Sequence, residues 1–139
     1  MLTLKIKDLY KSFGSTEVLK KINLDIEEGS FLVLLGPSGC GKSTLLNIIA
    51  GLETIDKGAV FIDDYDVSKV EPKDRNIAMV FQSYALYPSM TVKENIIFGL
   101  KQAKASKNKI EEQLNKVSGL LKVNELLNRR PSQLSGGQR

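Results

Sequence analysis

The chain has 139 residues, of which 42% are hydrophobic and 26% charged, as in an ordinary globular protein with one hydrophobic core. Its longest uninterrupted apolar runs, of which Phe31–Leu35 is one, are far shorter than the roughly 20 residues that a membrane-spanning helix needs, so we expect a cytosolic protein. The net charge of +4 comes from the segment Lys101–Lys122, where six lysines outweigh two glutamates, and we interpret this excess as the solvated face of a helix rather than a surface for nucleic acid.

Two segments near the N-terminus alternate apolar and polar residues, which is the pattern of strands with one buried face. These segments are Leu2–Lys7 and Ile22–Glu27, and we expect them to be antiparallel strands. After a turn, the apolar run Phe31–Leu35 predicts a strand covered on both faces, as found in the middle of an α/β sheet. The next apolar segment, Lys42–Ala50, predicts a buried helix that ends at Gly51. The residues that we expect inside this helix are Leu45, Leu46, Ile48 and Ile49.

The pattern then changes from strands to helices. Ala59–Ile62 and Ile77–Phe81 predict two short strands. Thr91 with Glu94 three residues later forms a capping box, which predicts a helix from about Val92 to Lys104. A second helix is predicted after a candidate cap at Ser106 by apolar residues at helical spacing, namely Ile110, Leu114, Val117 and Leu121.

The segment Gly36–Ser43 matches G-x-x-x-x-G-K-[ST], and we expect Gly36–Thr44 to form a loop that binds the phosphates of a nucleoside triphosphate. The glycines let backbone N–H groups point at phosphate oxygens, and the helix that begins at Lys42 directs the positive end of its dipole at the same anion. Lys42 should contact the β- and γ-phosphates, and the Ser43 hydroxyl should bind Mg²⁺. The loop residues predicted to bind the nucleotide are Gly36, Pro37, Ser38, Gly39, Cys40, Gly41, Lys42, Ser43 and Thr44.

The chain has one cysteine, Cys40, and no histidine. An internal disulfide is therefore excluded, and a zinc site of the usual His/Cys type is not expected. Any metal should be a hard ion bound by oxygens, such as Mg²⁺. We interpret Cys40 as a small side chain that fits the loop rather than as a redox group.

Three further motifs narrow the class of phosphate-loop protein. Leu134–Gln138 resembles the signature motif that is diagnostic of ATP-binding-cassette (ABC) ATPases. Val80–Gln82, at the end of a predicted strand, resembles the Q-loop, and Phe13 matches the aromatic residue of the A-loop, which stacks on adenine in the family. The stretch Asp74–Pro88 resembles most closely the ATPase subunits of sugar importers of the maltose and multiple-sugar type, although Ser89 stands where these importers commonly have histidine.

The resemblance implies an α/β fold: a P-loop NTPase core with an N-terminal antiparallel β subdomain and the start of a helical subdomain, truncated. On this interpretation residues 1–139 are an incomplete nucleotide-binding domain. Residues 1–82 form the β subdomain and P-loop core, and residues 83–139 form the Q-loop and helical subdomain up to the signature motif. Tyr84, Leu86, Tyr87 and Phe98 fit a core role and a contact with membrane subunits equally well.

The resemblance also implies ATP as the nucleotide, with Phe13 and Val18 among the residues that bind it. Gln82 would act with Lys42 in catalysis, bind Mg²⁺ and sense the γ-phosphate, although from the residues alone it is only a polar residue after a strand. Ser135 begins another S-x-x-Q cap, and its helix end offers a second anion site. In the family this site serves the ATP of a partner subunit. Its residues here are Ser135, Gly136, Gly137 and Gln138.

The partners that the resemblance implies follow from this second site. We expect a head-to-tail dimer of ATPase subunits that binds transmembrane permease subunits at the cytoplasmic side of the membrane. A substrate-binding protein would be an indirect partner, and nucleic acid is not expected.

Hydrolysis also requires a carboxylate that completes the Mg²⁺ shell and a group that orients water. In the family these follow the signature motif, as a strand ending in Asp-Glu and a switch histidine, and the sequence stops at Arg139. We therefore expect the 139-residue chain to bind ATP without hydrolysing it and to be poorly stable alone, and the full gene product to be an importer ATPase, with sugars as the favoured cargo. Two alternatives stay open: a cassette ATPase of translation or DNA repair, and a nucleotide-binding module without catalysis.

Overall fold

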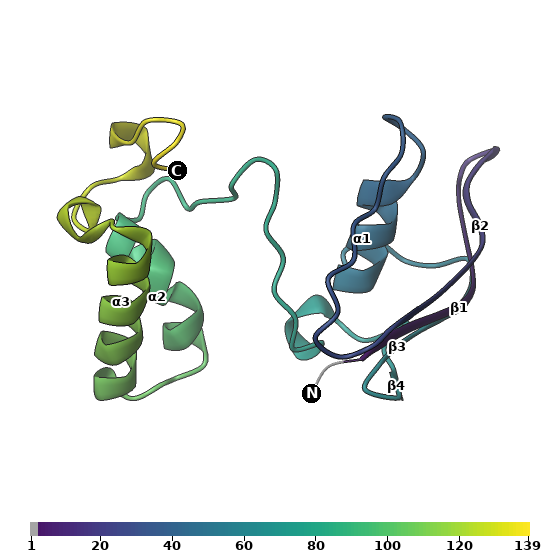
Figure 1. The fold of residues 1–139 in the computed structure, drawn as a ribbon, viewed down its shortest axis with the longest axis horizontal. Coiled ribbons are helices and arrows are strands. Elements are labelled where there is room, and N and C mark those ends of the chain that lie inside the picture. Colours follow the sequence, from purple (N-terminus) through teal and green to yellow (C-terminus); the bar gives the residue numbers. More distant parts are fainter. Residues whose placement is uncertain (1–2) are drawn as a thin grey trace. The chain divides into compact units, whose positions relative to one another are not determined.

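The computed structural model describes residues 3–139, and the chain divides into two compact units. The first unit, Met1–Met79, contains a β-sheet and helix α1, and the second, Val80–Arg139, is helical (Figure 1). Among the described residues, no helix is both long and apolar enough to cross a bilayer.

The sheet of the first unit has the strand order β2-β1-β3-β4 within residues 3–139, and all neighbouring strands are antiparallel. Gly14 and Ser15 form the tight turn between β1 and β2. The predicted antiparallel pair and the predicted strand Ala59–Ile62 are therefore confirmed, and Leu2 lies outside the described residues. The strands are β1 Leu4–Phe13, β2 Thr16–Ile26, β3 Lys57–Ile62 and β4 Tyr65–Asp66.

The core of the first unit is formed by apolar residues of the sheet and of α1, Lys42–Ala50. Ile48 of this helix is 1% exposed, and burying a side chain of its size stabilises the fold by about 1.5–3 kcal/mol. Leu46 is 47% exposed, so the expectation that it lies inside was wrong. A helix on the surface of one unit buries only one stripe of its side chains, and Leu46 lies off that stripe. The buried core residues are Ile6, Leu9, Leu19, Leu45, Ile48, Val60, Ile62 and Val67.

Helix α1 ends at Gly51 as predicted, and a buried arginine satisfies its last carbonyls. Arg75 donates from Nη1 to the carbonyl oxygens of Ile48 (2.8 Å) and Ile49 (2.9 Å), and from Nε to that of Val70 (2.9 Å). Burial lowers the pKa of Arg75, but the negative end of the helix dipole favours its charge. Gly51 leaves room for this guanidinium, because a Cβ there would lie 2.6 Å from Nε of Arg75.

Two of the predictions of strands were wrong. No strand forms at Phe31–Leu35 or Ile77–Phe81, and no strand among residues 3–139 pairs with either segment. Phe31 is 93% exposed and Leu35 is 89% exposed, so the run is not covered on both faces. A strand needs a hydrogen-bonded neighbour, and an apolar run cannot supply that neighbour by itself.

The second unit contains α2, Val92–Gln102, and α3, Lys107–Leu121. The hydroxyl of Thr91 accepts from the N–H of Glu94 (3.2 Å), and the Glu94 carboxylate accepts from the N–H of Thr91 (2.7 Å), which confirms the predicted capping box. The same N–H lowers the pKa of Glu94. α2 ends slightly earlier than predicted. The predicted cap at Ser106 is confirmed, because its hydroxyl accepts a backbone N–H of the first turn of α3.

Aromatic residues of the second unit are only partly used for packing. The rings of Tyr87 and Phe98 lie 4.6 Å apart between centroids, yet Tyr87 is 47% exposed and Tyr84 is 56% exposed. Asn95 of α2 fixes this segment, since its Oδ1 accepts the N–H of Tyr87 at 2.8 Å.

The lysines of Lys101–Lys122 are all exposed, as expected for a solvated face. Short 3₁₀ turns occur at Pro72–Asp74, Asn124–Leu126 and Pro131–Gln133.

Candidate nucleotide-binding site

The predicted phosphate loop leads into the N-terminus of α1 (Figure 1). Its last glycine, Gly41, lies close to β2. Gly39 and Gly41 both have φ +80°, in the left-handed region that favours glycine. A Cβ at Gly41 would lie 2.8 Å from Cγ1 of Val18 and 2.9 Å from Cδ2 of Leu19. A side chain at this position would therefore push the loop away from β2.

Lys42 lies across the loop that precedes it. Its Nζ donates to the carbonyl oxygens of Gly36 (2.9 Å) and Pro37 (3.0 Å), and it lies 3.7 Å from Sγ of Cys40. A Cβ at Gly36 would come within 2.8 Å of the same sulfur atom. Cys40 is thus a small side chain that fits against the loop, and two loop carbonyls hold the Lys42 ammonium.

The start of α1 is open to an anion. No side chain caps this end, and the first turn contains no acidic residue. The first N–H groups of a helix have no partner within the helix, and the helix dipole adds a partial positive charge to them. Ser43 is exposed in this turn and Thr44 is half-buried. Backbone N–H groups, an ammonium and a hydroxyl therefore meet at one place, and this donor set fits a polyphosphate with a bound hard cation.

A β-bulge in the hairpin brings Val18 toward the loop. Lys11 pairs with Leu19 and Ser12 pairs with Glu17, so Val18 has no partner on β1. A bulge of this kind bends the strand and redirects a side chain. Val18 is half-buried and would contact a side chain at the last loop glycine, so the structure brings this predicted residue together with the phosphate loop.

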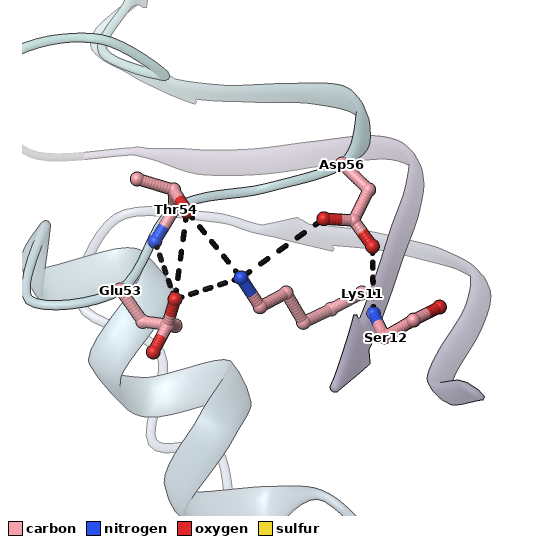
Figure 2. A network of polar contacts seen from close by, with 5 residues as sticks. All are labelled: Lys11, Ser12, Glu53, Thr54 and Asp56. Atoms are coloured by element: carbon pink, nitrogen blue, oxygen red, sulfur yellow. Dashed lines mark hydrogen bonds and ion pairs between the residues drawn. The ribbon is translucent and has the colours of Figure 1, made fainter. Parts of the chain in front are cut away.

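Phe13 is the last residue of β1 and is 48% exposed. Beside it lies a polar network that the sequence analysis missed (Figure 2). Lys11 Nζ donates to Oε1 of Glu53 at 2.7 Å and to Oγ1 of Thr54 at 3.3 Å, and lies 4.0 Å from Oδ1 of Asp56. The hydrogen bond from Lys11 lowers the pKa of Glu53.

The sequence carries a signal for this network. Leu9 and Lys11 are two residues apart on one strand, so both side chains lie on the same face. Leu9 is 0% exposed and Lys11 is 6% exposed. A lysine in phase with core residues predicts a buried cation that needs an acidic partner, but the sequence does not reveal the partner.

The remaining predicted residues belong to the second unit. Gln82 is exposed in a turn near the start of that unit. The N–H of Ser135 donates to Oε1 of Gln138 (2.9 Å), and the N–H of Gln138 donates to Oγ of Ser135 (3.4 Å). The reciprocal cap predicted at Ser135 is therefore present, and residues 136–138 form a turn. Gly136 and Gly137 are exposed within this turn.

A glycine loop with an ammonium inside it, at the uncapped start of a helix, defines the class of P-loop nucleotide-binding proteins. The family model described as ABC transporter matches residues 19–139. The chain therefore belongs to the ABC transporter family.

The curated relatives that the chain resembles include ATP-binding proteins of importers. It is 51% identical over 139 residues to sn-glycerol-3-phosphate import ATP-binding protein UgpC 2 of Rhizobium johnstonii, covering 100% of this chain and 40% of that protein. It is also 51% identical over 140 residues to UgpC of Escherichia coli K12, covering 100% of this chain and 39% of that protein. The chain thus spans about 40% of the length of these relatives.

Solved structures agree on the fold. A dimeric post-hydrolysis structure of the ATP-binding cassette MJ0796 with ADP and Pi is 36% identical, with a TM-score of 0.82 over 97% of this chain and 64% of that chain. A nucleotide-free ATP-binding cassette from an ABC transporter is 29% identical, with a TM-score of 0.80 over 99% of this chain and 61% of that chain. The expected P-loop NTPase fold is confirmed as that of an ATP-binding cassette.

Proposed function

We propose that this chain is the nucleotide-binding part of the ATPase subunit of an importer, and that ATP binding and hydrolysis by the whole protein drive transport. The observation that carries the proposal is the position of Lys42, whose ammonium lies inside the glycine loop at the start of α1. The importer ATP-binding proteins that resemble the whole chain support a role in transport.

The residues of the first unit have separate tasks in this proposal. Lys42 binds the β- and γ-phosphates together with the N–H groups of the loop. The exposed hydroxyl of Ser43 is a ligand for Mg²⁺, which neutralises charge on the phosphates when it is bound. Phe13 stacks on adenine, and Val18 lines the side of the site next to the loop.

Residues of the second unit have the remaining roles that we propose for the whole protein. The amide oxygen of Gln82 binds Mg²⁺ or positions water near the γ-phosphate. The turn at Ser135, with Gly136, Gly137 and Gln138, offers backbone N–H groups to the ATP held by a second ATPase subunit. This arrangement is a head-to-tail dimer, and the dimeric MJ0796 cassette supports it.

The partners and cargo of the protein follow from the same comparison. We infer that permease subunits hold the ATPase at the cytoplasmic side of the membrane as a peripheral protein, and that a substrate-binding protein delivers the cargo. The relatives are named for import of sn-glycerol-3-phosphate, a small phosphorylated polyol, which supports a sugar or sugar-like cargo.

The test is nucleotide binding followed by hydrolysis in the full-length protein. A Lys42→Ala variant should bind ATP about 10- to 100-fold more weakly, because it loses charge-assisted hydrogen bonds to phosphate. Lys20→Ala, which removes an exposed lysine of β2, is the matched control and should leave binding unchanged. Unchanged binding by Lys42→Ala would refute the site.

Steady-state hydrolysis decides between a motor and a module that only binds nucleotide. Turnover by the full-length protein that is lost in Lys42→Ala and in Gln82→Ala supports the motor. ATP binding without any turnover, in the presence of the permease subunits, supports the binding module instead.

A further inference from the structure

The buried Lys11 stands out among the lysines of the first unit. It is 6% exposed, and taking an ammonium out of water is costly unless it is paired and hydrogen-bonded. The pairing is present: Glu53 accepts at 2.7 Å and Thr54 at 3.3 Å, with the Asp56 carboxylate 4.0 Å away (Figure 2). All three partners follow α1 in the chain, so the ammonium is anchored to the segment between α1 and β3.

The same ammonium also contacts an aromatic ring. Lys11 Nζ lies over the ring of Phe13, 5.0 Å from its centroid, which is within range of a cation–π interaction. Phe13 is 48% exposed, so the lysine covers part of the ring and leaves a large part of it accessible. One buried cation thus joins two partly exposed carboxylates to an exposed aromatic ring.

Backbone contacts from the same segment fix the strand just before Phe13. The N–H of Ser12 donates to Oδ2 of Asp56 at 2.7 Å, and the N–H of Asp56 donates to the carbonyl oxygen of Tyr10 at 3.0 Å. The backbone that carries Phe13 and the cation over its ring are therefore held by one short segment. Neither can move without breaking bonds to it.

We propose that Lys11 is a positioning residue for the base of the nucleotide: held by Glu53, it fixes the Phe13 ring so that the exposed part of the ring presents a platform to adenine. The inference rests on the proposed role of Phe13. Lys11 does not contact the nucleotide. It restricts the orientations of the Phe13 ring, so the ring loses less conformational entropy when the base stacks on it.

A double-mutant cycle in the full-length protein tests this role. Lys11→Met removes the ammonium and keeps an unbranched apolar side chain, and it should weaken MgATP binding about three- to tenfold. Binding of inorganic tripolyphosphate, which has no base, should not change. In a Phe13→Ala background, Lys11→Met should cause no further loss of MgATP affinity, because the ring that it positions is absent.

The same strand provides a matched control. Lys7 also lies over an aromatic ring, 5.2 Å from the centroid of Phe61, but Lys7 is exposed. Lys7→Met removes an equivalent cation–π pair and should leave MgATP affinity unchanged.

The outcomes separate the two proposals. If Phe13→Ala does not weaken MgATP binding, the adenine platform itself is refuted, and the role of Lys11 with it. If Phe13→Ala weakens binding but Lys11→Met does not, only the role of Lys11 is refuted. The same conclusion follows if the two losses add, or if tripolyphosphate binding falls equally, because either result indicates a general structural effect.

A second variant covers the case in which Lys11→Met does not fold. Glu53→Gln keeps the shape of the acceptor and removes the charge that anchors the ammonium. It should weaken MgATP binding about two- to fivefold, through greater freedom of Lys11, and this loss too should vanish in the Phe13→Ala background. A loss that persists in that background overturns the proposal.

Discussion

Replacing Gly41 with alanine should distinguish the two reasons for which this position needs glycine, namely its positive φ and its close approach to β2. Gly41 has φ +80°, and this conformation costs alanine about 1–2 kcal/mol. The new Cβ would also lie 2.8 Å from Val18 and 2.9 Å from Leu19, and such overpacking costs about 1–3 kcal/mol more. Gly41→Ala should therefore lower the free energy of unfolding by about 2–5 kcal/mol.

Gly39 provides the comparison, because it has the same φ of +80° and nothing within 4 Å of its added Cβ. Gly39→Ala should lose only the conformational part, about 1–2 kcal/mol. Urea unfolding of the full-length protein, followed by circular dichroism, measures both variants. Equal midpoints for the two variants would refute the close contact between the loop and β2. Binding of a fluorescent ATP analogue should weaken more in Gly41→Ala than in Gly39→Ala. The displaced loop leads into the N-terminus of α1, where we propose that the phosphates bind.

Three further outcomes are expected. Arg75→Met removes the guanidinium donor from the carbonyl of Ile49 and leaves that of Ile48 with only the N–H of Gly51, so it should lower the free energy of unfolding by about 3 kcal/mol in urea titrations. Ile48→Ala should cost about 2–5 kcal/mol in the same assay, whereas Leu46→Ala, at an exposed position, should cost less than about 1 kcal/mol. The N–H of Thr91 lowers the pKa of Glu94, so the capping box contributes fully above the ordinary value of 4.5 and is lost as the pH falls through the lowered pKa. Glu94→Gln should flatten this acid loss in urea midpoints measured between pH 3 and 7, and an unchanged slope would contradict the assignment.

Local signals in the sequence predicted local structure well. The capping box at Thr91, the cap at Ser106 and the end of α1 at Gly51 each depend on a few neighbouring residues, and all three are present. The two strands with alternating residues are also present, since they pair with each other across a tight turn. The strand predicted at Phe31–Leu35 is absent because no described strand pairs with it. The composition of the segment does not show whether such a partner exists.

The candidate site shows the same difference between local signals and contacts of residues far apart in the chain. The glycines and Lys42 of the phosphate loop form one continuous motif, so the motif can be read from the sequence alone, and its role in nucleotide binding stays a prediction. Val18 is brought to the loop by a bulge, and Lys11 is held by residues more than forty positions away in the chain. Contacts of that kind depend on tertiary structure and carry no fixed spacing. The roles of Phe13, Gln82 and Ser135 stay predictions that the binding and hydrolysis assays address.

The two carbonyl contacts of Lys42 have a consequence for the thermodynamics of binding. A lysine that is free in solvent loses up to about 2 kcal/mol of side-chain entropy when it is fixed. Lys42 is already held by its own loop, so much of that loss occurs during folding and little is left for the encounter with a nucleotide. In the proposed complex with a nucleotide, charged phosphate oxygens would replace these neutral carbonyl acceptors. Its gain is therefore chiefly electrostatic, and the ionic strength of the solution should govern how tightly the loop holds a polyphosphate.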